Sequence, residues 1–435
     1  MAVSGKRVDT VPGGARAAST TERILDRLFS PHRPFTVRLW NGTTLPAAGD
    51  SRFTIVLTHA GALRRMLLPP TDLGVGEAFV RGDFEVEGDL EAAVGVMADA
   101  ALSRSPREWI EVALLALALP RMAAGGTVLP RAQLSGRRHS LARDRIAVRH
   151  HYDVGNDFYA LWLDRRLVYS CAYFPMGTED LDTAQEAKLE HICRKLRLRP
   201  GERLLDIGCG WGGLVRYAAA RYGVHTLGVT LSEPQARYAQ EQIRADGLDG
   251  RAEVRVVDYR EVRDEPFDKL VSVGMFEHVG RERLPEYFRQ AWALLRPGGL
   301  FLNHGIAARP TAVIRHTRAL GPSFMQAHIF PDGELEPIAD TLVAAEAVGF
   351  EVRDVENLRE HYARTLRLWL RNLEAQSRRA VEVAGEGRFR TWRLFLAASA
   401  QGFAAGRTEV FQALLARPDA SGTVALPWSR AHLYE

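Results

Sequence analysis

The fold of this chain is decided by one stretch, Glu202-Arg-Leu-Leu-Asp-Ile-Gly-Cys-Gly-Trp-Gly-Gly213. Its apolar part, residues 204–207, is short enough for a single buried strand, and three glycines follow at alternate positions. Residues 214–222 then have the composition of a helix. A strand, a glycine turn and a helix in this order open a nucleotide-binding α/β sheet, because glycine bends tightly and lets a ligand approach the backbone.

The spacing of the three glycines limits which nucleotide-like ligands the turn is expected to bind. Most dinucleotide-binding proteins have Gly-x-Gly-x-x-Gly, whereas this chain has Gly-x-Gly-x-Gly. No Gly-Lys-Ser or Gly-Lys-Thr follows, which argues against a phosphate-binding loop. Asp206 precedes the glycines at the end of the strand. Together with the strands and helices that follow, the pattern favours S-adenosylmethionine (SAM), a cofactor without phosphate groups.

The rest of the C-terminal half alternates between expected strands and expected helices. Strands are expected at 225–230, 252–257, 267–273, 300–306 and 349–356, and helices at 183–196, 232–245, 284–295, 338–347, 358–376 and 389–417. This alternation predicts a mostly parallel, doubly wound sheet, whose ligands lie beyond the carboxyl ends of the strands. The residues expected at that rim are Asp206, Thr230, Asp258, the segment 274–280 and His304.

Composition divides the chain into four parts. Residues 1–20 are small and polar and are expected to form a disordered tail. Residues 21–125 combine helical and strand-like segments and predict a small α+β domain. A linker rich in arginine follows at 126–146, and residues 147–435 form the Rossmann-like α/β domain. The linker is interpreted either as a solvated connector or as a patch that meets anionic head groups, where each basic side chain contributes about 1 kcal/mol.

Composition also limits the location and the partners. The 435 residues are 46% hydrophobic and 25% charged with a net charge of +4, which is ordinary for globular proteins, and no nucleic acid partner is expected. The three cysteines form neither a disulfide framework nor a Cys-x-x-Cys site, and His150-His151 lacks further ligands, so no metal is expected. A signal peptide pattern is absent, and the longest apolar run, 112–119, is too short to cross a bilayer. We expect a cytoplasmic protein, peripheral to the inner face of the membrane.

Six stretches carry a resemblance to a known family. They are His151-Tyr-Asp-Val-Gly-Asn-Asp-Phe158, Tyr169-Ser-Cys-Ala-Tyr-Phe174, Leu205-Asp-Ile-Gly-Cys-Gly-Trp-Gly-Gly213, Gly228-Val-Thr-Leu-Ser232 with Gln235, Met275-Phe-Glu-His-Val-Gly280, and Ile329-Phe-Pro331. With them the chain resembles, over about 147–420, the cyclopropane-fatty-acyl-phospholipid synthase family of SAM-dependent enzymes. The preceding region resembles that of the bacterial phospholipid-acting synthases, which the mycolic-acid-modifying branch lacks.

The resemblance implies transfer of a methylene group from SAM to the cis double bond of an unsaturated phospholipid acyl chain. The methyl sulfonium of SAM is electrophilic enough for an alkene to attack it without a metal. The resulting carbocation requires an apolar channel, aromatic faces for cation–π contact and a base that removes a proton. In the family this base is a bicarbonate ion, and its ligand positions match here as Cys171, Glu277, His304, Ile306 and Tyr362.

The SAM site is expected at the glycine loop and the neighbouring strand ends. The expected residues are Tyr169, Ser170, Asp206, Gly208, Cys209, Gly210, Gly212, Thr230, Leu231, Gln235, Asp258 and Tyr259. The glycines approach the methionine part and the sugar, and Thr230, Leu231 and Gln235 lie where the ribose is expected. Thr230 stands where many nucleotide sites carry an acid. Asp258 and Tyr259 are expected to flank the adenine, and Tyr169 and Ser170 to close over the methionine carboxylate.

Three other functions stay open. The carbocation can shift a hydride and lose a proton elsewhere, which leaves a methylene-branched or, after reduction by a flavoprotein reductase partner, a methyl-branched acyl chain. The retained bicarbonate positions favour the cyclopropane. The second alternative is a methyltransferase for a small polar metabolite, and the third is a lipid-binding or scaffold protein with a vestigial SAM fold. A homodimer is expected because relatives form them, and residues 21–125 are expected to help dock the membrane.

Overall fold

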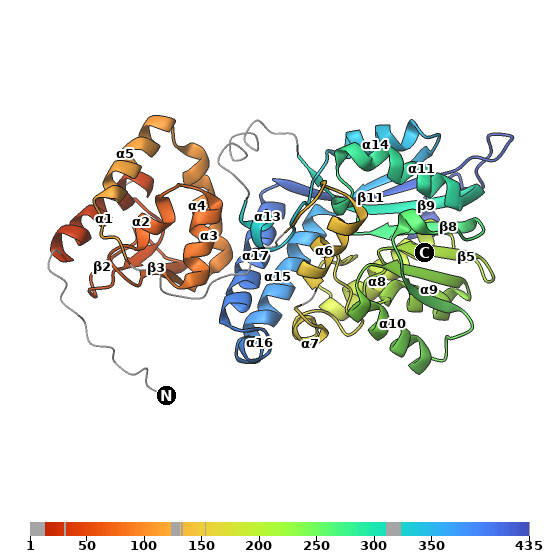
Figure 1. Cartoon of the computed structure of the whole chain (residues 1–435), viewed down its shortest axis with the longest axis horizontal. Helices are drawn as coiled ribbons and strands as arrows, with labels where there is room; N and C mark the ends of the chain where they lie inside the picture. The colour runs from red at the N-terminus through yellow and green to blue at the C-terminus, as the bar shows by residue number, and fades with distance from the viewer. Residues whose placement is uncertain are drawn as a thin grey trace. The chain divides into compact units, whose positions relative to one another are not determined.

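The structure is a computed structural model, and it describes residues 14–29, 32–122, 131, 134–152, 154–309 and 323–434 (Figure 1). The chain divides into two compact units. The N-terminal unit comprises Met1–Arg131, Thr311–Ile329 and Gly385–Gln401, and the sheet unit comprises Ala132–Pro310, Phe330–Ala384 and Gly402–Glu435. Neither unit is one continuous stretch, so two segments expected in the C-terminal domain group with the N-terminal unit instead.

The N-terminal unit contains a four-stranded sheet in the order β2-β1-β3-β4. Its elements are α1 (Gly14–Phe29), β1 (Thr36–Arg38), β2 (Thr44–Leu45), β3 (Phe53–Leu57), α2 (Ala62–Leu67), α3 (Asp72–Arg81), β4 (Phe84–Gly88), α4 (Leu90–Ser103) and α5 (Pro106–Leu117). Alternate residues of β3 are buried, as in a strand with one covered face. The expected tail was wrong for residues 14–20, because they begin α1, where Ala17 and Ala18 are buried; residues 1–13 lie outside the described residues.

Two later segments join the N-terminal unit through specific contacts. The backbone N–H of Phe324, which begins α13 (Phe324–His328), donates to the Asp72 carboxylate at 2.9 Å. The Phe324 ring packs so close to Gly76 that a Cβ there would lie 2.3 Å from it. On α17 (Glu386–Ala404), the Arg390 guanidinium donates to the Phe79 carbonyl at 2.9 Å. The two hydrogen bonds span 252 and 311 positions of sequence, which is why composition could not reveal them.

The sheet unit contains seven strands in the order β10-β11-β9-β8-β5-β6-β7. They are β5 (Arg203–Ile207), β6 (His225–Thr230), β7 (Ala252–Val256), β8 (Phe267–Val273), β9 (Leu295–Ala308), β10 (Glu351–Asn357) and β11 (Thr408–Ala416). Five strands pair in parallel, and β11 runs antiparallel to both β9 and β10. The prediction of a mostly parallel α/β sheet is confirmed.

Helices cover both faces of this sheet (Figure 1). The helices of the sheet unit include α6 (Leu141–Tyr152), α7 (Asn156–Tyr159), α8 (Leu181–Leu196), α9 (Gly213–Tyr222), α10 (Glu233–Ala245), α11 (Leu284–Leu294), α14 (Ile338–Glu346), α15 (Arg359–Ala375) and α16 (Ser377–Ala384), with short turns η1 (Tyr259–Glu261), η2 (Phe276–His278), η3 (Arg281–Arg283) and η5 (Ala431–Leu433). Leu204 packs with α8 and α9, whereas its neighbour Leu205 packs with α11. Burial on both faces explains why the adjacent residues Leu204 and Leu205 of β5 are both apolar.

The helix expected at 389–417 was wrong in its second half. Helix α17 ends at Ala404, Gly406 adopts a left-handed φ of +66°, and residues 408–416 form strand β11. This strand pairs with β9 along its whole length, from Thr408 opposite Ala308 to Ala416 opposite Leu300. Apolar residues on both faces of a short segment do not distinguish a buried strand from a helix, so the pairing with β9 decided the outcome.

Candidate active site

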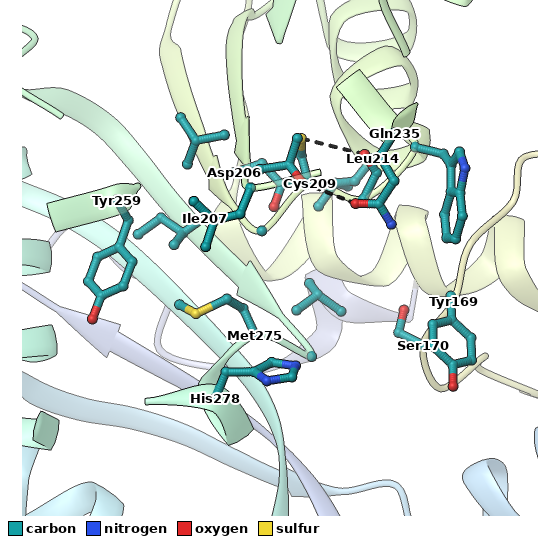
Figure 2. A pocket seen from close by; sticks show the side chains of 18 of the residues that line it. Tyr169, Ser170, Asp206, Ile207, Cys209, Leu214, Gln235, Tyr259, Met275 and His278 are labelled. Atoms are coloured by element: carbon teal, nitrogen blue, oxygen red, sulfur yellow. Dashed lines mark hydrogen bonds between the residues drawn. The ribbon is translucent and has the colours of Figure 1, made fainter. Parts of the chain in front are cut away.

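A cavity opens at the carboxyl ends of β5, β6 and β8 in the sheet unit (Figure 2). Every residue expected to bind SAM lines it except Gly212. Gly212 has a different role, because a Cβ there would lie 2.9 Å from the Ala239 Cβ on α10, and its φ is +77°. The rule that ligands bind beyond the carboxyl ends of parallel strands therefore predicted the position of the cavity correctly.

The wall at the end of β6 carries an amide instead of an acid. The Thr230 hydroxyl donates to Gln235 Oε1 at 3.0 Å, an interaction drawn in Figure 2. This bond orients the side chain and leaves Gln235 Nε2 buried without a partner among the described residues. An unpaired buried donor is costly, so this amide is positioned to bind a ligand acceptor in the cavity.

The far wall contains an ion-pair cluster that the sequence did not reveal. Arg260 on η1 pairs with Asp258 at 2.8 Å and with Asp144 of α6 at 2.8 Å. The Asp258 carboxylate also accepts the backbone N–H of Arg260 at 3.0 Å. Asp258 therefore lines the cavity with its carboxylate already engaged, and the Tyr259 ring, labelled in Figure 2, lines it as well.

The opposite wall combines Tyr169 and Ser170 with Asp206 and Lys188. Asp206 Oδ1 is buried and has no partner among the described residues. Burial raises the pKa of Asp206 to about 7, although the nearby Lys188 ammonium acts in the opposite direction. Lys188 donates to the Ser170 hydroxyl at 2.7 Å. A lysine on a helix gives no sequence signal that it will enter a cavity, and for this reason Lys188 was missed.

The five residues expected to hold bicarbonate do not line this cavity. Glu277 on η2 accepts the backbone N–H of Ile306 at 2.7 Å, and its other carboxyl oxygen, Oε2, is buried without a partner among the described residues. Burial raises the pKa of Glu277 to about 7. His304 lies two residues before Ile306 on β9; its Nδ1 pairs with Gln412 Nε2 at 3.2 Å, and its buried Nε2 has no described partner.

Cys171 and Tyr362 are associated with α15. The Cys171 thiol donates to the carbonyl oxygens of Ala172 at 3.3 Å and Leu358 at 3.7 Å. Burial raises the pKa of this thiol, which excludes a reactive thiolate. Leu358 is the N-cap of α15, and Tyr362 lies one turn later. The cysteine is therefore a buried link between the 169–174 segment and the helix that carries Tyr362.

Aromatic rings connect the cofactor wall to α15. Tyr169, which lines the cavity, lies 5.5 Å from the Trp162 ring and 5.3 Å from the Trp369 ring. Trp369 in turn contacts Tyr362 at 6.0 Å between ring centroids. Ring faces of this kind stabilise a nearby positive charge without offering a nucleophile. The cluster is a buried aromatic core that links the cavity wall to α15.

The arginines at the end of the expected linker are paired. Arg143 binds Asp332, Arg145 binds Glu261 at 3.0 Å, and Arg149 binds Glu233 at 3.3 Å. Residues 141–146 also belong to α6 and not to a linker, whereas 126–130 lie outside the described residues. Paired guanidinium groups attract lipid head groups less strongly, so the connector interpretation is favoured over the head-group patch.

Two features are absent from the described part of the chain. None of its helices is both long enough and apolar enough to cross a bilayer. Within the same residues, no three or more histidine, cysteine, aspartate or glutamate side chains are grouped in a way that could hold a metal ion.

Comparison with known proteins identifies the family. Residues 139–413 match the family model described as mycolic acid cyclopropane synthetase. A probable fatty acid methyltransferase of Pseudomonas putida is 38% identical over 411 residues, covering 94% of this chain and 98% of that protein. A probable fatty acid methyltransferase of Mycobacterium tuberculosis is 38% identical over 410 residues, with 91% and 93% covered.

Other relatives match less than two thirds of the chain. The cyclopropane-fatty-acyl-phospholipid synthase of Escherichia coli K12 is 38% identical over 278 residues, or 64% of this chain and 69% of that protein. The crystal structure of the mycolic acid cyclopropane synthase CmaA1 complexed with SAH and CTAB is 36% identical, with a TM-score of 0.59 over 62% of this chain and 97% of that chain. The chain belongs to the mycolic acid cyclopropane synthetase family and is a SAM-dependent methyltransferase.

Proposed function

We propose that this protein methylates the double bond of an unsaturated fatty acyl chain in a lipid, and that its product is methylene- or methyl-branched. The observation that carries the proposal is the similarity to two probable fatty acid methyltransferases along nearly the whole chain. The similarity to the Escherichia coli cyclopropane synthase is equally strong but covers 64% of this chain. The region outside that match is shared with the fatty acid methyltransferases, which favours the branching product over the cyclopropane.

The cavity fits SAM. Its unpaired acceptor Asp206 Oδ1 suits the ammonium group of the methionine part, and its unpaired donor Gln235 Nε2 suits a ribose hydroxyl. The Tyr259 ring offers a flat surface for the adenine. When bound, SAM supplies a methyl group on a sulfonium, which an alkene can attack. The chain itself orients the cofactor and keeps the reacting carbon away from water.

Proton removal is assigned to the Glu277 and His304 region. Glu277 Oε2 and His304 Nε2 are both buried without described partners, and burial lowers the pKa of His304 well below its ordinary value, so the imidazole is neutral. A neutral imidazole and a carboxyl group with a pKa of about 7 can hold a bicarbonate ion by hydrogen bonds. Bicarbonate held there would supply the base.

A cyclopropane is the second candidate product. It is favoured by the same pair of unpaired groups, because ring closure requires a base that removes a proton from the newly added methyl group. The branching product requires loss of a different proton and, for a saturated branch, a flavoprotein reductase partner. We therefore propose methylation of the alkene as the reaction and the branched chain as its product, with the cyclopropane as the alternative product.

The test is a product analysis. The purified protein is incubated with SAM and vesicles that contain a mono-unsaturated phospholipid, and the lipid is examined by proton NMR. An exocyclic vinyl signal is expected for the branching reaction. Upfield ring-methylene signals with loss of the vinyl signal would show that the product is a cyclopropane and not a branched chain. Unchanged lipid from a protein that binds SAM would overturn the proposal in favour of a small-metabolite methyltransferase.

Membrane docking is proposed for the N-terminal unit. Helix α5 exposes Ile110, Leu114 and Leu117 at spacings of four and three, each more than half exposed. Two exposed arginines lie beyond the ends of this apolar stripe: Arg107, which pairs with Glu111 at 3.6 Å, and Arg121. Apolar residues flanked by arginine suit the interface of a bilayer that contains anionic lipids.

A homodimer of the kind that relatives form is part of the same proposal.

The docking test replaces one residue of the stripe. Leu114→Asp should reduce co-sedimentation with vesicles of anionic phospholipid. Val343→Asp is the matched control, because Leu114 and Val343 are each 64% exposed and Val343 lies on α14 of the other unit. Equal retention of the two variants would overturn the docking surface. Deletion of residues 1–125 is a poorer test, because the N-terminal unit also contains 385–401.

A further inference from the structure

Helix α8 carries two buried lysines, Lys188 and Lys195, seven residues apart and each 1% exposed. Their surroundings differ. The Lys195 ammonium lies 2.5 Å from Glu356 and 3.2 Å from Asp354, so its charge is neutralised within the protein. The Lys188 ammonium donates to the Ser170 hydroxyl at 2.7 Å, and no carboxylate of the described residues lies within 4 Å of it.

The acids nearest to Lys188 do not form an ion pair with its ammonium group. Asp164 is buried, but its two carboxyl oxygens accept the backbone N–H groups of Val168 at 2.8 Å and Arg166 at 2.9 Å. Asp206 keeps Oδ1 unpaired and lies on the same cavity wall. Burial lowers the pKa of Lys188 to about 8, although Asp164 and Asp206 act against this change. A buried ammonium without a contacting anion is unfavourable. In the ligand-free protein, the Lys188 ammonium therefore lacks an anionic partner.

Lys188 also determines what Ser170 can do. An ammonium only donates hydrogen bonds, so the Ser170 oxygen accepts from Lys188 and its own O–H remains free to donate. One turn earlier, Gln185 Nε2 donates to the carbonyl oxygens of Val168 at 3.1 Å and Ser170 at 3.0 Å. Gln185 therefore fixes the backbone of this segment, and Lys188 fixes the direction of the serine hydroxyl.

Both Lys188 and Ser170 line the cavity, as does Asp206. The wall thus offers a buried positive charge with a hydroxyl donor, and beside it a carboxyl acceptor. An α-amino acid zwitterion has the complementary pair of groups. We infer that Lys188 is a positioning residue that holds Ser170 as a donor and supplies the counter-charge for the carboxylate of SAM. This inference rests on the SAM site of the proposed function and adds the residue that recognises the amino-acid end of the cofactor.

The test compares two ligands of the Lys188→Met variant by isothermal titration calorimetry. S-adenosylhomocysteine has the amino-acid end, whereas methylthioadenosine retains the adenosine and the sulfur but lacks that end. We expect the variant to lose about 10- to 100-fold in affinity for S-adenosylhomocysteine, the range for a hydrogen bond to a charged group. Its affinity for methylthioadenosine should stay within about twofold of the wild type, because a side chain that only supports the fold affects both ligands alike.

Lys195→Met is the matched control, since Lys195 lies on the same helix, is equally buried and does not line the cavity. It should lower the melting temperature and leave the ratio of the two affinities unchanged. If Lys188→Met does not fold, Ser170→Ala replaces it, with the same selective loss expected. Equal losses for both ligands, or no loss for S-adenosylhomocysteine, would overturn the inference.

The lipid reaction is not needed for this test. A wild-type protein that binds S-adenosylhomocysteine but leaves the lipid unchanged would overturn the proposed function and not the role of Lys188. A wild-type protein that binds methylthioadenosine but not S-adenosylhomocysteine would overturn the role of Lys188. Binding of neither ligand would overturn both.

Discussion

The Glu277 carboxylate accepts the backbone N–H of Ile306 at 2.7 Å, just beyond the point where strand β8 ends beside β9. The last residue pair of these strands is Val273 with His304, so the N–H of Ile306 has no strand partner on that side. Glu277 takes the place of that partner and leaves one carboxyl oxygen, Oε2, buried and unpaired. The end of a strand thereby holds an acid in a buried position.

The first prediction concerns pH and stability. Burial raises the pKa of Glu277 from 4.5 to about 7 in the folded chain. The protonated carboxyl therefore stabilises the fold fully below about pH 4.5, and this contribution of about 3 kcal/mol is lost as the pH rises through about 7. The side chain of Glu277→Gln stays neutral at every pH. The free energy of unfolding of this variant, relative to that of the wild type, should therefore rise by about 3 kcal/mol between about pH 4.5 and about pH 7.

Urea denaturation of both proteins at about pH 5 and about pH 8 measures the difference. Glu241→Gln, an exposed glutamate on α10, is the control and should show no pH-dependent difference from the wild type. A constant difference for Glu277→Gln across the range would contradict a protonated Glu277 in the folded protein.

The second prediction separates chemistry from cofactor binding. His304→Leu removes the unpaired Nε2, so methyl transfer should fall by about 100-fold or more, the usual loss for a general-base site. Because His304 does not line the cofactor cavity, affinity for S-adenosylhomocysteine should be unchanged. Gln412→Met, which removes only the 3.2 Å contact with His304 Nδ1, should have a smaller effect. Single-turnover rates and calorimetry provide the two quantities, and a parallel loss of rate and affinity would refute the separation.

The third prediction concerns the ribose wall. Gln235→Ala removes the unpaired Nε2, and we expect affinity for both S-adenosylhomocysteine and methylthioadenosine to fall by about tenfold, since both ligands contain the ribose. Thr230→Val removes only the donor that orients Gln235 at 3.0 Å and should cost less. Calorimetric titration with both ligands measures the pattern. A loss restricted to S-adenosylhomocysteine would place Gln235 at the amino-acid end instead.

The fourth prediction concerns the cluster of Arg260, Asp258 and Asp144. Arg260→Met leaves two largely buried carboxylates without their shared cation, which should lower the free energy of unfolding by about 3 kcal/mol. Asp144→Asn in the same chain should recover part of this loss, because it removes one of the uncompensated charges. Thermal and urea unfolding of the single and double variants test the coupling; strictly additive effects would show that the three groups act independently.

The sequence by itself determined the elements whose signal is local. Strand β5, its glycine turn and helix α9 follow from an apolar run, three glycines and a helical composition within twenty residues. The same signals placed Asp206, Thr230 and Gln235 at one rim, because parallel strands bring their carboxyl ends together. The family motifs predicted the residues around Glu277 and His304, although their roles remain predictions.

The tertiary structure alone decided features that depend on distant partners. Residues 408–416 became a strand because β9 offered an unpaired edge, and 323–329 joined the N-terminal unit through Phe324 and Asp72. Lys188 and Lys195 have the same residue type on the same helix, yet only Lys195 meets carboxylates. Hydrogen bonding, burial and charge pairing act through space, so a pattern read along the chain predicts an element but not the neighbours that define its chemistry.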